Sequence, residues 1–115
     1  MSELGVKICG ITTPEDALVA QELGADYLGM ILSQGFSRSI LPDEAVDIGL
    51  VAETSLVAVL VDESLDEAQR IAELSGASVI QLHGEENVEY VEELRRRGMW
   101  TIWKAVRVRD PEDVT

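Results

Sequence analysis

The sequence predicts an α/β fold in which parallel strands alternate with helices. Short apolar runs alternate strictly with segments of helical periodicity, and one strand–helix unit recurs roughly every 25 residues. The apolar runs are nearly continuous, which is typical of strands buried on both faces of a parallel sheet. Helix-start signals follow the runs, as at Thr13 and Ser64 and, after a longer loop, at Pro42. With 46% hydrophobic residues in 115, the chain can bury the core of one domain.

The first strand is expected over residues 6–11 and contains the single cysteine of the chain, Cys9. Thr13 is followed by Pro14 and two acidic residues, which predicts a helix over residues 14–23 with Gly24 as its C-cap. The apolar stripe of this helix is expected to consist of Ala17, Leu18, Ala20 and Leu23. This unit is therefore a strand, a tight turn and a helix.

Two further units follow. A strand is expected over residues 27–32, and a loop over residues 33–41 leads to a helix that Pro42 begins. The next strand is expected over residues 55–62. Its helix should begin after the cap Ser64, run to about Leu74 and end at Gly76. The inward residues of that helix are expected to be Leu65, Ala68, Ile71 and Ala72.

The last units complete five strands. A strand over residues 78–83 should precede a helix over residues 87–97 that Gly98 closes, and another strand is expected over residues 101–108. Asp110 and Pro111 then predict a further helix start. Since one helical turn is barely stable alone, we expect residues 1–115 to be the first part of a longer chain. The alternative is a complete, doubly wound open sheet of five strands.

Charge and composition exclude several functions. The formal net charge is −13, which argues against nucleic-acid binding because phosphate contacts need clustered basic residues. The only basic cluster, residues 95–97, lies at a predicted helix end, where cations complement the dipole. No apolar run approaches the roughly 20 residues of a membrane span, and no signal peptide is apparent. A lone thiol suits a reducing compartment, so we expect a cytoplasmic protein.

Polar side chains lie at the carboxyl ends of the predicted strands, where parallel α/β folds carry their chemistry. Lys7 and Cys9 share one face of the first strand because side chains alternate. Gln81 and His83 share parity in the same way on the fourth strand. Asp62 ends the third strand and is interpreted as the cap of the following loop rather than as a residue of the site.

Two motifs carry a family resemblance. The first is Lys7-Ile8-Cys9-Gly10-Ile11-Thr12 and the second is Gln81-Leu82-His83-Gly84-Glu85, and together they resemble phosphoribosylanthranilate isomerases of tryptophan biosynthesis. The resemblance extends through residues 37–40, 56–61 and 104–106. It implies a (β/α)₈ TIM barrel, of which residues 1–115 match strand 1 to the start of helix 5. Other phosphate-binding barrels fit less well because they do not explain the first two motifs together.

The resemblance implies an Amadori rearrangement of N-(5′-phosphoribosyl)anthranilate to 1-(2-carboxyphenylamino)-1-deoxyribulose 5-phosphate. It implies no metal and no organic cofactor, and a small phosphosugar–anthranilate as substrate. The family's general base matches Cys9, and the family's arginine for the anthranilate carboxylate matches Arg38. A thiol must be partly ionised to accept a proton, and Lys7 is placed to favour the thiolate. Gln81, His83 and Lys7 are expected to line the substrate site.

The resemblance also implies parts that residues 1–115 do not match. The family's general acid is an aspartate on the sixth strand, and its phosphate site is formed after strands 7 and 8. We therefore expect this chain to be inactive alone. A partial barrel has two open sheet edges, so we expect it to bind the C-terminal half of a barrel or to self-associate. The alternative function is a non-catalytic half-barrel fragment or assembly module.

Overall fold

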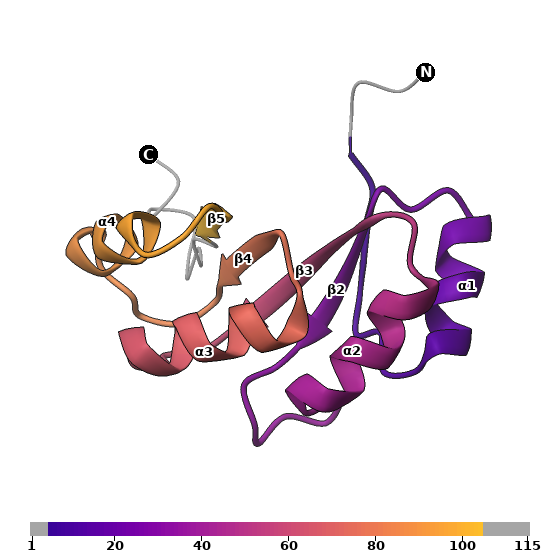
Figure 1. Cartoon of the computed structure of the whole chain (residues 1–115), viewed down its shortest axis with the longest axis horizontal. Helices are drawn as coiled ribbons and strands as arrows, with labels where there is room; N and C mark the ends of the chain where they lie inside the picture. The colour runs from indigo at the N-terminus through magenta and orange to yellow at the C-terminus, as the bar shows by residue number, and fades with distance from the viewer. Residues whose placement is uncertain (1–4, 105–115) are drawn as a thin grey trace, which may run out of the picture.

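The computed structural model describes residues 5–104 and contains five strands and four helices in strict alternation (Figure 1). The predicted strand positions 105–108 and the helix start at Asp110 lie outside the described residues. The elements, in chain order, are β1 (Lys7–Cys9), α1 (Pro14–Glu22), β2 (Tyr27–Ile31), α2 (Pro42–Val51), β3 (Ser55–Leu60), α3 (Leu65–Ser75), β4 (Val79–Leu82), α4 (Val88–Arg96) and β5 (Thr101–Lys104).

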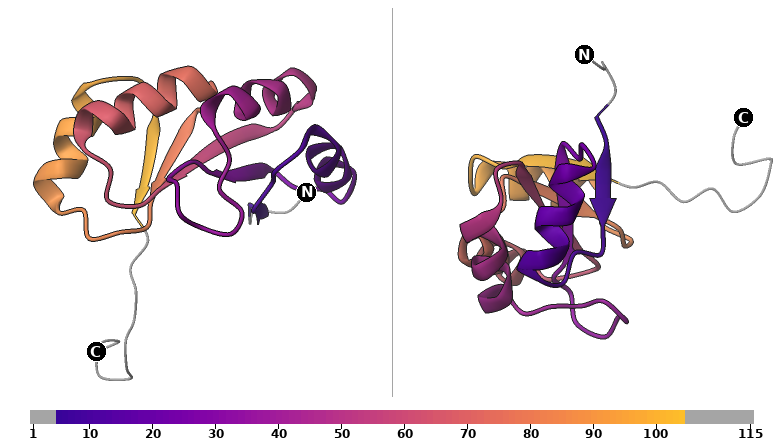
Figure 2. Two further views of the ribbon diagram at one scale, coloured as in Figure 1. Left: turned by 90° about the horizontal axis from the view of Figure 1, so that it is seen from below. Right: turned by 90° about the vertical axis from the view of Figure 1, so that its right-hand side faces the viewer.

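All five strands belong to one parallel sheet, and their order in the sheet is the order of the chain. The helices lie together on one face of this sheet (Figures 1 and 2). A doubly wound sheet instead reverses its strand order and has helices on both faces. The alternative of a doubly wound open sheet is therefore wrong, and the observed winding is that of a barrel segment.

The two faces of the sheet have different surroundings because side chains alternate along each strand. The face toward the helices is the main core, and its largest fully buried strand residues are Leu28, Met30, Leu60, Ile80 and Leu82. The other face has a small cluster of three buried valines, Val57, Val59 and Val79. Lys7, Cys9 and Gln81 belong to this second face by strand register.

The second face is concave, because side chains meet across it from strands that are not neighbours. Adjacent strands lie roughly 4.8 Å apart, so β1 and β4 would be roughly 14 Å apart in a flat sheet. Lys7 of β1 nevertheless donates a hydrogen bond to Gln81 of β4. Tyr27 of β2 and Trp103 of β5 also meet, with ring centroids 4.9 Å apart. The sheet therefore curls toward this face, as it does in a barrel.

Local capping signals explain where the helices begin. The side chains of Thr13, Ser64 and Asn87 each accept a hydrogen bond from the backbone N–H three residues later, as N-caps do. Gly76 ends α3 in the left-handed conformation, as predicted. In α1 the C-cap is Leu23, and Gly24 is the next residue, with φ +95°.

Two details differ from the sequence predictions. Leu18 and Leu23 were expected to face inward, but they are 46% and 75% exposed, and only the alanines of α1 are buried. The helix lies beside β1, which pairs with β2 alone among the described strands, so no neighbour covers its outer side. The first strand also ends earlier than predicted, because the N–H groups of Gly10 and Ile11 both donate to the Gly29 carbonyl, 3.0 Å away.

No helix in residues 5–104 is long and apolar enough to cross a membrane.

Candidate active site

The predicted site residues lie at the carboxyl ends of the strands. Cys9 is the last residue of β1, and Arg38 belongs to the loop after β2. Gln81 lies in β4, and His83 follows it directly. Cys9, Arg38 and His83 are exposed, whereas Lys7 and Gln81 are half-buried.

A glycine directly after Cys9 allows Arg38 to approach the end of β1. Gly10 follows Cys9 with φ +85°, and a Cβ at this position would lie 3.0 Å from both Cδ and Nη1 of Arg38. The arginine side chain therefore lies directly over the Gly10 backbone. A larger residue at position 10 would displace the guanidinium and would also be strained at this φ.

A second glycine makes room for the thiol. Gly29 is opposite Cys9 in the β1–β2 register, and a Cβ there would lie 3.1 Å from the Cys9 Sγ. Sequence reasoning did not single out this residue. A glycine inside a predicted strand was the available signal, because such a glycine often marks a close approach.

A cleft of about 590 Å³ lies between β1, α1 and the loop after β2. Cys9, Gly10, Thr12 and Arg38 line its polar part, and apolar side chains from β1 and α1 line the rest. Asp16 also borders it and accepts hydrogen bonds from the backbone and side chain of Thr12. These bonds to Thr12 lower the pKa of Asp16 below its ordinary value. The Arg38 guanidinium is the only cation lining the cleft in the described part of the chain.

Lys7, Gln81 and His83 form a second group on the concave face. Lys7 Nζ donates to Gln81 Oε1, and Gln81 Nε2 lies 3.2 Å from His83 Nε2. The backbone N–H of His83 donates to the Leu60 carbonyl of β3 at 2.9 Å. The structure thus joins three of the predicted site residues. Lys7 and Cys9 lie on the same face of β1, which places the two groups side by side.

A third polar cluster was not predicted. The Glu86 carboxylate is only 2% exposed and accepts hydrogen bonds from Lys104 Nζ at 2.8 Å, Asp62 N at 2.9 Å and Gly84 N at 2.9 Å. Burial by itself raises the pKa of Glu86, but the hydrogen bond from Lys104 and those from backbone N–H groups outweigh it. The pKa of Glu86 therefore lies below its ordinary value of 4.5.

Asp62 also differs from its prediction. Its Oδ1 accepts a hydrogen bond from the backbone N–H of Glu85 at 2.7 Å, and its own backbone adopts φ +54°. Asp62 thus connects the loop after β3 to the loop after β4, whereas Ser64 caps the next helix. Together with Glu86 and Lys104, it holds the carboxyl ends of three strands in place.

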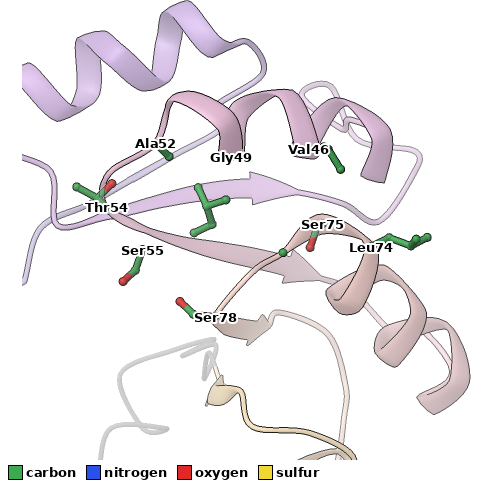
Figure 3. A pocket seen from close by; sticks show the side chains of 10 residues that line it. Val46, Gly49, Ala52, Thr54, Ser55, Leu74, Ser75 and Ser78 are labelled. Atoms are coloured by element: carbon green, nitrogen blue, oxygen red, sulfur yellow. The ribbon is translucent and has the colours of Figure 1, made fainter.

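A different depression lies at the opposite end of the strands. A groove of about 440 Å³ between α2 and α3 is lined by small, apolar and hydroxyl side chains (Figure 3). Its hydroxyl-bearing residues are Thr54, Ser55, Ser75 and Ser78. None of its lining residues is an acid, a base or a thiol, so this groove has no group suited to proton transfer.

The family profile described as N-(5′-phosphoribosyl)anthranilate (PRA) isomerase matches residues 6–114. The chain belongs to this isomerase family. The profile spans both motifs and every element of the described fold, so the resemblance of the motifs to this family is confirmed.

Individual isomerases agree with this assignment. N-(5′-phosphoribosyl)anthranilate isomerase of Geobacter sp. strain M21 is 46% identical over 111 residues, which are 95% of this chain and 52% of that protein. The crystal structure of phosphoribosyl anthranilate isomerase from Thermus thermophilus has a TM-score of 0.88 and 40% identity, covering 94% of this chain and 54% of that one. The chain spans about half the length of the curated isomerases it matches.

A related isomerase structure contains a ligand. Phosphoribosyl anthranilate isomerase in complex with reduced 1-(o-carboxyphenylamino)-1-deoxyribulose 5-phosphate has a TM-score of 0.89 and 34% identity. The matched region covers 96% of this chain and 57% of the isomerase chain in that complex. The prediction of a partial barrel fold is therefore confirmed for the described residues, 5–104.

Proposed function

We propose that this chain supplies the general base and the carboxylate-binding arginine of an N-(5′-phosphoribosyl)anthranilate isomerase of tryptophan biosynthesis. The observation that carries the proposal is the position of Arg38 against Gly10, the residue that follows Cys9 at the carboxyl end of β1, in a cleft that Cys9 and Arg38 both line. Membership in the isomerase family supports it independently. We place the reaction in the cytoplasm, because a thiol that acts as a base must stay reduced.

The proposed reaction needs one acid and one base. An acid protonates the furanose ring oxygen, and the bond between that oxygen and C1 breaks to give a protonated Schiff base. The Cys9 thiolate then removes the proton from C2. The electrons of the C2–H bond form a C1=C2 double bond, which gives an intermediate that is both an enol and an enamine. Return of the proton at C1 and loss of the enol proton give the 2-ketose. Every step is a proton transfer or an electron-pair shift, so no redox partner is needed.

Arg38 fits the task of binding the anthranilate carboxylate. A guanidinium pairs with a carboxylate through two parallel hydrogen bonds, which fixes orientation as well as charge. The arginine lies over the backbone of the residue that follows the base. A carboxylate bound by Arg38 therefore brings the rest of the substrate close to the Cys9 thiol. The Lys7, Gln81 and His83 group is proposed to contact the same substrate from β4 and β1.

We further propose that the general acid and the phosphate site are formed by a part of the barrel that this chain does not match. The chain corresponds to about half of each isomerase, and the sheet ends at β1 and β5 among the described strands. A β-strand edge presents unpaired backbone groups and favours pairing with another strand. The partner is proposed to be the complementary half of a barrel, with self-association as the second possibility.

The test uses a chimera in which residues 1–115 are joined to the second half of the Geobacter isomerase. We expect the chimera to consume N-(5′-phosphoribosyl)anthranilate, and the loss of the substrate's fluorescence measures this reaction. We expect the 115-residue chain alone to show no turnover. A folded chimera without activity would contradict the proposed function. Turnover by the chain alone would contradict only the placement of the acid and phosphate site outside it.

A further inference from the structure

A chain of hydrogen bonds crosses the concave face of the sheet from β1 to β4. Lys7 Nζ donates to the amide oxygen of Gln81, and the amide nitrogen of Gln81 lies 3.2 Å from Nε2 of His83. Lys7 and Gln81 are separated by 74 residues in sequence, and both are half-buried. The contact therefore depends on the curvature of the sheet.

The lysine decides which way the amide group points. An ammonium group has three donors and no acceptor, so only the oxygen end of the Gln81 amide can face it. The NH₂ end of the amide must then face the imidazole ring. Turning the amide over would place its two N–H bonds against the Lys7 ammonium, and two donors cannot bond to one another.

The amide in turn decides where the imidazole proton lies. An NH₂ group only donates, so Nε2 of His83 must accept through its lone pair. A neutral imidazole that accepts at one nitrogen carries its proton on the other, which here is Nδ1. The backbone of His83 is itself held by its N–H bond to the Leu60 carbonyl, which places the base of the side chain next to Gln81.

We propose that Lys7 sets the tautomer of His83 through Gln81, so that the neutral form of the ring carries its proton on Nδ1. Gln81 is thus a positioning residue, and Lys7 acts on the ring without touching it. This arrangement makes His83 a hydrogen-bond donor at Nδ1, because the lone pair at Nε2 is already used. His83 is accordingly not a second general base beside Cys9.

The tautomer predicts what this part of the site binds. An Nδ1–H group pairs with an acceptor oxygen, such as one from a carboxylate, a carbonyl or a phosphate, and it repels a donor at the same place. That this donor serves the isomerase substrate rests on the proposed function. The tautomer itself does not, since it follows from contacts within the chain.

His83 is the only histidine in the sequence, so its ring resonances in an NMR spectrum need no assignment. The experiment measures long-range proton–nitrogen correlations of the ring in the ¹⁵N-labelled 115-residue chain, at a pH where the ring is neutral. We expect Nδ1 to be protonated and Nε2 to be unprotonated. Protonation mainly at Nε2 in the unmodified chain would overturn the proposal.

Variants test the role of the lysine. In Lys7→Met the amide can turn over, so we expect the population with Nε2 protonated to rise, whereas Lys7→Arg keeps a donor and should keep the proton on Nδ1. Arg38→Met removes another cation of the site and should leave the tautomer unchanged. An identical tautomer in Lys7→Met and the unmodified chain would contradict the proposal.

A further variant covers the case in which Lys7→Met does not fold. Gln81→Glu has nearly the same shape but no donor, so the ring should donate from Nε2 to the new carboxylate. Retention of an unprotonated Nε2 in Gln81→Glu would also overturn the proposal. The two proposals can fail separately. If the chimera is inactive but the unmodified 115-residue chain has its His83 proton on Nδ1, the proposed function is refuted and the tautomer proposal stands.

Discussion

The two ends of the strands are built differently. At the carboxyl end, charged and polar side chains from distant parts of the chain form hydrogen bonds, as in the contacts of Glu86 with Lys104 and of Asp62 with the backbone of Glu85. At the amino end, short hydroxyl and apolar side chains line an open groove between α2 and α3 (Figure 3).

The glycines differ in the same way. At the carboxyl end, Gly10 and Gly29 are needed because Arg38 and Cys9 occupy the space of a side chain. At the amino end, Gly24 and Gly76 have open space where a Cβ would lie, and they serve only the turn. At Gly10 and Gly29 the closely approaching side chains are the predicted site residues Arg38 and Cys9, whereas at the amino end Gly98 is approached by the Trp100 ring. Substitutions should therefore affect activity at the carboxyl end and have little effect at the amino end.

The largest effect is expected for Cys9→Ala. Loss of a general base lowers the rate by about 10²–10⁴-fold, and we expect the kcat of the chimera to fall by that amount. The control is Ser55→Ala, which removes a hydroxyl at the amino end of β3 and should leave kcat unchanged. Equal losses in both variants would show that the two ends do not differ in function.

Arg38→Met should come next. Removing one partner of a charged hydrogen bond costs about 1.5–3 kcal/mol, which is roughly a ten- to a hundredfold rise in KM for the chimera. Because the arginine is exposed and lies on a loop, the free energy of unfolding should change little. A lower kcat with unchanged KM would contradict the carboxylate-binding role.

Lys104→Met tests stability rather than catalysis. It leaves the buried Glu86 carboxylate without its cation, and we expect a loss of about 1–3 kcal/mol in the free energy of unfolding, measured by denaturant titration of the 115-residue chain. At the amino end, Thr54→Val removes only a hydroxyl that lies 3.4 Å from Gln21 and should change stability by less than about 0.5 kcal/mol. A Thr54 effect as large as that of Lys104 would contradict the comparison.

The smallest expected effect is a pH dependence. Because the pKa of Glu86 is lower in the folded chain than its ordinary value of 4.5, its ionised form stabilises the fold at higher pH. This contribution should be lost as the pH falls below 4.5 toward the folded pKa. The measurement is the free energy of unfolding as a function of pH, which should fall less steeply in Glu86→Gln. Parallel curves for the two chains would contradict the role of Glu86.

The sequence predicted what depends on neighbouring residues. The caps Thr13 and Ser64 bond within three residues of themselves, so the signal and the contact lie in the same short segment. The strand parity that places Lys7 with Cys9 is equally local. Membership in the isomerase family was also readable from two short motifs, because their residue types and spacing are specific in combination.

The sequence did not predict contacts that depend on how the sheet curves. Lys7 contacts Gln81, and Tyr27 contacts Trp103, only because the sheet is curved. The curvature brings together β1 with β4 and β2 with β5, which are not neighbours in the sheet. The position of Glu86 likewise depends on a loop whose path follows from bonds to Asp62 and Gly84. In α1, apolar periodicity alone placed Leu18 and Leu23 inward, whereas burial depends on which neighbours the helix has.

The strand order β1-β2-β3-β4-β5 has a consequence for synthesis on the ribosome. Each strand pairs with the one made just before it, so no strand must wait for a distant segment before its first hydrogen bonds form. The nascent chain can therefore add one strand–helix unit at a time, and a newly made edge strand is exposed only until the next strand emerges. Slowed translation between units would lengthen that exposure, and the sheet edge would then be most open to pairing with another nascent chain.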